Sequence, residues 1–225
     1  MINKEYLKEH YNNIFTKSKE KINDGGIKDD FLSNVQSDKR MSLDIIIRLP
    51  SDISKNIKNC INKLKELELD SMYFYPSSNF HMTVFDILKA ETDRKIPENI
   101  NEYINCIKEC VKQIKPFEME FEGITSSDNA VLVKGFYDNE LEKLREILRE
   151  SIVKNNLKLE ERYKTISAHI TIARIKDKLK NPEKYISFIE NEKDTNFGKM
   201  KVESMELIFH NWYDTKRKIL TQINL

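Results

Sequence analysis

The pattern of hydrophobic and polar positions alternates between helical and strand-like segments. Apolar residues recur at helical spacing in several amphipathic segments, at residues 3–22, 52–69, 98–114, 139–156 and 182–190. Runs rich in β-branched and aromatic residues predict strands at 42–49, 72–76, 79–87, 117–124, 130–137, 167–175, 200–210 and 218–225. This mixture predicts an α+β protein.

The order of these elements repeats along the chain. A helix that starts at Asp52 precedes His81 by 29 residues, and a helix that starts at Asn139 precedes His169 by 30 residues. Such spacing indicates a duplicated unit. We therefore expect an N-terminal helix and arm at residues 1–40, followed by one domain at 41–225 with repeats at about 41–125 and 126–225. Two like units that pack about a pseudo-two-fold axis would give a bilobal sheet fold, with helices outside and a central cleft between the histidines.

Composition narrows the class of protein. A third of the residues are charged, while Gly and Pro contribute only 5 each, which is typical of an ordered soluble domain. The formal net charge of +1 gives no global attraction to nucleic acid or anionic membranes, so a polyanionic ligand needs a local site. The 3 cysteines show no metal-ligand or redox spacing. The N-terminus lacks an apolar signal region, so we expect a cytoplasmic protein without a membrane anchor or an obligate protein partner.

Two short motifs carry the candidate chemistry. "NFHMTVFDI" at residues 79–87 contains His81 and Thr83, and "SAHITIARI" at 167–175 contains His169 and Thr171. A single H-x-T is more often a packed histidine beside an ordinary β-former. Two such pairs among 4 histidines make coincidence the weaker interpretation.

Strand alternation predicts which side chains share a face. His81, Thr83 and Phe85 would lie on one face, with Asp86 on the other. In the second motif Ser167, His169 and Thr171 would lie together. Arg174 would lie opposite them, where a structural ion pair is its expected role.

Paired imidazoles and hydroxyls suit phosphodiester chemistry. An imidazole with a pKa of about 6.5 gives or takes a proton near neutral pH, and a nearby hydroxyl can bind a phosphate oxygen. We expect no metal and no cofactor. A zinc site built on His81 and His169 would need a third ligand, and neither His10 nor His210 belongs to such a motif. Those two histidines receive no role.

These residues resemble the 2H phosphoesterase superfamily, which includes bacterial 2′-5′ RNA ligase-like proteins and cyclic phosphodiesterases. The resemblance covers about residues 41–225. It implies that His81 and His169 are the general acid and base, in an order that the sequence does not determine, and that Thr83 and Thr171 bind the phosphate. It also implies metal-independent hydrolysis of a 2′,3′-cyclic phosphate, or of a related cyclic or 2′-5′-linked nucleotide or RNA end, with a 2′-phosphate as product.

Further candidates and alternatives accompany this prediction. Tyr75, which precedes the first motif, is a candidate for stacking on a base. Phe85 and Ser167 share the predicted catalytic faces and are candidate substrate contacts, although Phe85 also suits the core. Trp212 is expected to pack. The alternative functions are a 2′-5′ RNA end-joining ligase, and a non-catalytic module that binds RNA ends or nucleotides.

Overall fold

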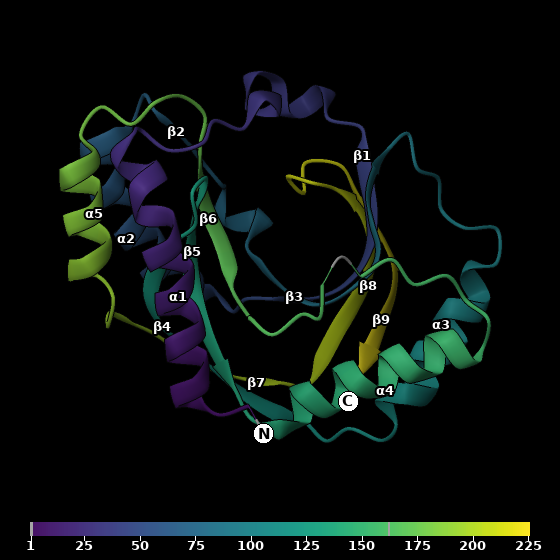
Figure 1. The fold of residues 1–225 in the computed structure, drawn as a ribbon. Coiled ribbons are helices and arrows are strands. Elements are labelled where there is room, and N and C mark those ends of the chain that lie inside the picture. The colour runs from purple at the N-terminus through teal and green to yellow at the C-terminus, as the bar shows by residue number, and fades with distance from the viewer. Residues whose placement is uncertain (1, 162) are drawn as a thin grey trace.

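Two antiparallel sheets stand beside each other in the computed structural model, which describes residues 2–161 and 163–225 (Figure 1). Sheet A has the strand order β3 (His81–Thr92), β1 (Arg40–Arg48), β8 (Ser204–Asn211) and β9 (Arg217–Asn224). Sheet B has the order β2 (Met72–Phe74), β6 (Ile170–Ile175), β5 (Ala130–Tyr137), β4 (Phe117–Ser126) and β7 (Asn196–Val202). The middle strand of sheet B, β5, is buried along its whole length, because both of its faces are covered.

Helices lie around the outside of the sheets (Figure 1). They are α1 (Lys4–Asn23), α2 (Ser51–Glu68), α3 (Ile100–Val111), α4 (Asn139–Lys154) and α5 (Pro182–Asn191). Two short 3-10 helices, η1 (Asp30–Ser37) and η2 (Ser77–Asn79), occur in the connections. The α-helices α3 and α4 pack on each other beside sheet A, while α2 and α5 lie against sheet B. The predicted α+β bilobal fold with outer helices is confirmed.

Each sheet draws strands from both halves of the chain. Sheet A combines β1 and β3 with β8 and β9, and sheet B combines β2 and β4 with β5, β6 and β7. The strand predicted at 200–210 is wrong as a single element, because the chain passes from sheet B to sheet A at Glu203. Hydrophobic periodicity does not detect this crossing, since the chain stays extended on both sides. The two-repeat boundary remains a prediction.

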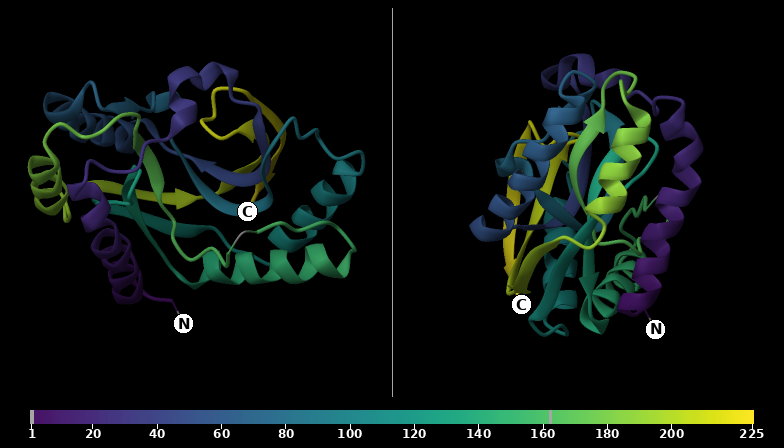
Figure 2. Two further views of the ribbon diagram at one scale, coloured as in Figure 1. Left: turned by 45° about the horizontal axis from the view of Figure 1, so that its top comes forward. Right: turned by 90° about the vertical axis from the view of Figure 1, so that its left-hand side faces the viewer.

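The N-terminal helix α1 is fixed firmly on sheet B. Asn3 caps its start by accepting a hydrogen bond from the Tyr6 backbone nitrogen at 2.9 Å. The helix ends before Gly25, whose φ of 100° suits glycine. Its Leu7 and Tyr11 side chains are fully buried. The right-hand view of Figure 2 shows α1 (purple) on one side of the molecule and the β8–β9 hairpin (yellow) on the other.

The cysteines and the helices give no sign of a disulfide or of a membrane span in the described part of the chain. Cys60, Cys106 and Cys110 are all buried free thiols. None of the helices in the described part of the chain is long and apolar enough to cross a membrane.

Candidate active site

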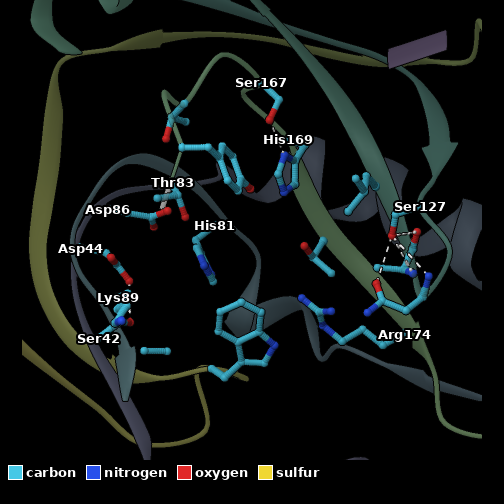
Figure 3. Close-up of a pocket in the computed structure, with 18 of the residues that line it drawn as sticks. Ser42, Asp44, His81, Thr83, Asp86, Lys89, Ser127, Ser167, His169 and Arg174 are labelled. Atoms are coloured by element: carbon cyan, nitrogen blue, oxygen red, sulfur yellow. Dashed lines mark hydrogen bonds between the residues drawn. The ribbon is translucent and has the colours of Figure 1, made fainter. Parts of the chain in front are cut away.

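A cavity of about 530 Å³ brings the two H-x-T motifs together (Figure 3). His81 and Thr83 reach it from β3, at the edge of sheet A. His169, directly before β6, and Thr171, within β6, reach it from sheet B. Strands β3 and β6 contact each other, so the four residues line one continuous space although the motifs are far apart in sequence.

A β-bulge changes the face on which the first motif ends. Thr83 pairs with Ile46 on β1, whereas Phe85 pairs with the next residue, Ile45, so Val84 is an extra residue on β3. Phe85 is consequently 0% exposed in the core, and Asp86 lines the cavity instead. The predicted placement of Phe85 beside Thr83, and of Asp86 on the opposite face, is therefore wrong.

The second motif contains the same irregularity. Thr171 pairs with Leu132 on β5 and Ala173 pairs with the adjacent Val131, so Ile172 is the extra residue. Arg174 therefore lines the cavity, which corrects its predicted position on the opposite face.

Arg174 is held by aromatic side chains, and it forms no ion pair with another residue that the structure describes. Its Nε donates a 2.9 Å hydrogen bond to the Tyr75 hydroxyl, and its guanidinium carbon lies 5.3 Å from the centroid of the Trp212 ring. Tyr75 also lines the cavity, but it is only 5% exposed. Its contact orients Arg174, and a stacking role for Tyr75 stays a prediction.

Each histidine of the motifs is oriented through Nδ1. His81 Nδ1 lies 2.8 Å from the Asn79 carbonyl oxygen, and because a carbonyl only accepts, this nitrogen carries the hydrogen. His169 Nδ1 lies 2.9 Å from the Ser167 hydroxyl, which can donate or accept. Both arrangements leave Nε2 as the nitrogen that meets a ligand. Ser167, predicted as a substrate contact, lines the cavity and touches His169.

The surroundings of the two rings differ in charge. Burial lowers the pKa of His81 to about 4, with a further lowering by His210 that Asp214 opposes. Burial also lowers the pKa of His169 to about 4, and the positive charge of Arg174 adds to the effect. A carboxylate and two cations, His210 and Arg48, therefore act on the pKa of His81, while the groups that act on the pKa of His169 include no carboxylate.

His210, to which the sequence analysis assigned no role, lies beside His81. The two ring centroids are 5.4 Å apart. His210 Nε2 is 2.7 Å from Asp44 Oδ2, and Nδ1 is 3.0 Å from Asp214 Oδ1. Burial alone opposes charge on this ring, but the hydrogen bonds to Asp214 and Asp44 raise the pKa of His210 to about 9. Both nitrogens donate, so His210 is a fixed imidazolium at the cavity wall.

Arg145 on α4 connects the two motifs from behind. Its side chain is 1% exposed. Its Nε donates to the Val84 carbonyl at 2.8 Å, at the bulge of the first motif. Its Nη atoms donate to the carbonyls of Ser167 at 2.9 Å, Ile166 at 3.0 Å and Thr83 at 3.3 Å. One guanidinium thus holds the backbone of both motifs. A buried arginine with helical spacing gives no sequence signal for this role.

The described residues contain no group of three or more His, Cys, Asp or Glu side chains placed to hold a metal ion.

Known proteins share the family and the fold of this chain. The family model for the AKAP7 2'5' RNA ligase-like domain matches residues 43–221. The structure of TT0787 from Thermus thermophilus is 16% identical, with a TM-score of 0.62 over 82% of this chain and 97% of that one. Escherichia coli LigT complexed with 3'-AMP is 14% identical, with a TM-score of 0.59 over 83% and 98%. No curated protein sequence matches the chain. At these identities the solved structures establish the fold.

Proposed function

The chain belongs to the AKAP7 2'5' RNA ligase-like domain family within the 2H phosphoesterase superfamily, and on this premise we propose that it hydrolyses nucleotide or RNA 2′,3′-cyclic phosphates. The observation that carries the proposal is the convergence of two imidazoles and two threonine hydroxyls on one cavity. Solved LigT structures of this fold hold 3'-AMP and phosphate, which supports a nucleotide substrate.

The proposed reaction needs one proton acceptor and one proton donor. The phosphorus sits between His81 and His169, while the hydroxyls of Thr83 and Thr171 donate to its non-bridging oxygens. One imidazole takes a proton from water as the water oxygen attacks phosphorus. The bond from phosphorus to the ribose 3′-oxygen breaks, and the second imidazolium protonates that oxygen. The product is a 2′-phosphate. With a 5′-hydroxyl in place of water, the same groups in the same roles would join two RNA ends through a 2′-5′ bond, and they would exchange roles in the reverse reaction, in which the 3′-hydroxyl attacks that bond and the 5′-hydroxyl leaves.

The Asp214 carboxylate is the basis for assigning His81 as the acid and His169 as the base, because burial and nearby cations lower the pKa of both rings to about 4. The acid must hold a proton before the reaction, and Asp214 raises the pKa of His81 against the effects of burial and of His210. His169 lies near Arg174 and Arg145, both of which lower its pKa and favour the neutral base. An anionic phosphate between the rings would raise the pKa of both histidines. The acid would then be protonated when the substrate is bound.

The first test is turnover of nucleoside 2′,3′-cyclic phosphates and of short RNAs with cyclic ends, in EDTA, with products resolved by phosphorus NMR. We expect a 2′-phosphate product. The variants His81→Ala and His169→Ala should each reduce kcat by about 1,000-fold, as loss of a general acid or base does. Thr83→Val and Thr171→Val should raise KM and lower kcat. Thr92→Val, on an exposed position of the same strand as Thr83, is the matched control.

Leaving-group chemistry tests the assignment of roles. A p-nitrophenyl phosphodiester releases a phenolate that needs no proton. His81→Ala should therefore regain most of its rate on that substrate, while His169→Ala should not. Equal loss in both variants would contradict this assignment.

Other outcomes separate the remaining functions. Loss of turnover in EDTA would refute the metal-independent mechanism. Joining of a 5′-hydroxyl RNA to the cyclic end without hydrolysis would favour the ligase. Binding of RNA ends without any turnover would favour a non-catalytic module.

A further inference from the structure

The N-terminal helix supplies one wall of the cavity. His10 and Ile14 of α1 both line it, and their spacing of four residues places them on one face of the helix. The family model matches residues 43–221, so α1 lies outside the matched region. This wall of the cavity therefore lies outside the part of the chain that the family model matches.

The wall is rigidly attached beside His169. The Tyr11 hydroxyl donates to the Gly135 carbonyl at 3.1 Å and accepts from the Ala168 backbone nitrogen at 3.0 Å. Ala168 immediately precedes His169. At the other end of the helix, Lys21 Nζ forms a 3.1 Å ion pair with Asp128 in the turn between β4 and β5. Helix, turn and motif consequently hold a fixed relative position.

A neighbouring wall of the cavity comes from the β4–β5 turn and the start of β5, on which α1 packs. Asn129, Ala130 and Leu132 all line the cavity there. Leu132 pairs directly with Thr171, so this region adjoins the proposed phosphate position. The Asn129 Oδ1 atom accepts a 3.0 Å hydrogen bond from the Ser127 hydroxyl, which orients the amide and presents its NH2 group as a donor.

The chemistry between these walls is apolar with a few hydrogen-bonding groups. Ile14, Ala130 and Leu132 give apolar surface, and His10 and Asn129 give an imidazole and an amide. Burial, with a smaller effect of Lys17, lowers the pKa of His10 and favours its neutral form. Arg174, the cross-strand partner of Ala130, is a cation beside this lining. On the helix side, where Ile14 and the neutral His10 lie, a flat heterocycle with polar edges fits better than a second phosphate, which would need cationic donors there.

We propose that α1 and the β4–β5 turn form a subsite for the nucleobase of the substrate. Ile14 packs against the face of the base, and His10 and Asn129 hydrogen-bond to its edge. This inference rests on the proposed function, since its ligand is the base of the nucleotide whose phosphate lies between the two motifs.

The test compares substrates with and without a base. Turnover is measured for the four nucleoside 2′,3′-cyclic monophosphates and for base-free 1,4-anhydroribitol 2,3-cyclic phosphate. The quantity of interest is the ratio of kcat/KM for each nucleotide to kcat/KM for the base-free compound. In the unmodified protein this ratio should exceed one. It should fall about tenfold in Ile14→Ala and in His10→Ala, as expected for loss of one side-chain contact to the substrate.

Lys19→Ala is the matched control. It removes a cation from the same helix, but one that pairs with Glu190 on α5 at 2.6 Å, away from the cavity. The ratio should not change in this variant. An unchanged ratio in His10→Ala and Ile14→Ala, or a ratio of one in the unmodified protein, would overturn the proposal. His10 is only partly buried, so its variant carries the test if Ile14→Ala does not fold.

Binding separates failure of this inference from failure of the proposed function. Calorimetric titration with adenosine 2′-monophosphate and with 1,4-anhydroribitol 2-phosphate needs no catalysis. The protein could show no turnover and yet bind adenosine 2′-monophosphate more tightly than the base-free compound, with this difference lost in His10→Ala. That result would support the base subsite and refute the hydrolase. Turnover with equal affinity for both compounds would keep the hydrolase and refute the subsite.

Discussion

Replacement of Arg145 by methionine tests whether one buried guanidinium positions both motifs. The side chain donates to the carbonyls of Thr83 and Val84 on one side of the cavity and to those of Ile166 and Ser167 on the other. Methionine keeps most of the volume and removes every donor. The four carbonyls would then be buried without these hydrogen bonds.

The expected cost follows from those hydrogen bonds. A buried acceptor that loses its donor costs about 1 to 3 kcal/mol, and the four losses do not add fully because the backbone can relax. Removing the charge also relieves a penalty, since burial lowers the pKa of Arg145. We therefore expect Arg145→Met to lower the free energy of unfolding by about 3 kcal/mol, a large part of the 5 to 15 kcal/mol of a typical domain. A displacement of about 1 Å between the motifs would lower kcat about 100-fold.

Urea unfolding and steady-state kinetics measure the two effects. Arg145→Lys retains the charge with a single nitrogen. It should therefore restore only part of the lost free energy of unfolding and only part of the lost kcat. Arg149→Met is the matched control, because Arg149 lies one turn further along α4 and pairs with Glu161 at 2.6 Å. It should cost about 1 to 3 kcal/mol, because the Glu161 carboxylate is only 8% exposed, and it should leave kcat unchanged. If Arg145→Met loses stability but keeps kcat, the positioning role is refuted. If Arg145→Met and Arg149→Met give the same stability and the same kcat, the proposed connection of the two motifs by Arg145 is refuted.

Three further predictions address the same framework. In Gly135→Ala the new Cβ would lie 1.9 Å from the Ala168 carbonyl oxygen, so urea unfolding should show a loss of about 3 kcal/mol. The pKa of His210 is raised from 6.5 to about 9, so its stabilisation is complete below pH 6.5 and disappears as pH rises through 9. The free energy of unfolding in urea should fall by about 3 kcal/mol over this range in the unmodified protein but not in His210→Gln, and a flat unmodified curve would contradict the ion pairs. Ser167→Ala should lower kcat/KM about tenfold by freeing His169, and nitrogen NMR of the His169 ring should show a changed tautomer ratio.

Local sequence patterns predicted the elements and the family. The helix expected at 139–156 is α4 at Asn139–Lys154, and the strand expected at 130–137 is β5 over the same residues. Both are set by short-range periodicity and by turn residues beside them. The repeated H-x-T was specific enough to identify the superfamily, because it needs only the residues and their order. The catalytic roles of His81 and His169 stay predictions.

What the sequence did not reveal depends on contacts between distant segments. His210 is separated from Asp44 by 166 positions, yet their 2.7 Å contact determines its charge. Arg145 looks like one more cation on an amphipathic helix. The sequence predicted a helix and an arm at residues 1–40 without a place in the fold, and α1 reaches the cavity through His10 and Ile14. Hydrophobic periodicity describes each helix or strand separately, so it carries no information on contacts between distant segments.

The misplaced side chains share one physical cause. Alternation assumes two residues per repeat, and a single extra residue after each threonine reverses every face beyond it. Both motifs contain that residue, at Val84 and at Ile172, as the predicted duplication would give. As a result the fifth residue after each histidine faces the cavity, and these equivalent positions carry opposite charges, Asp86 and Arg174. Two matching bulges thus place opposite formal charges in one cavity. Such an unequal setting is what two chemically identical histidines need if one is to give a proton while the other takes one.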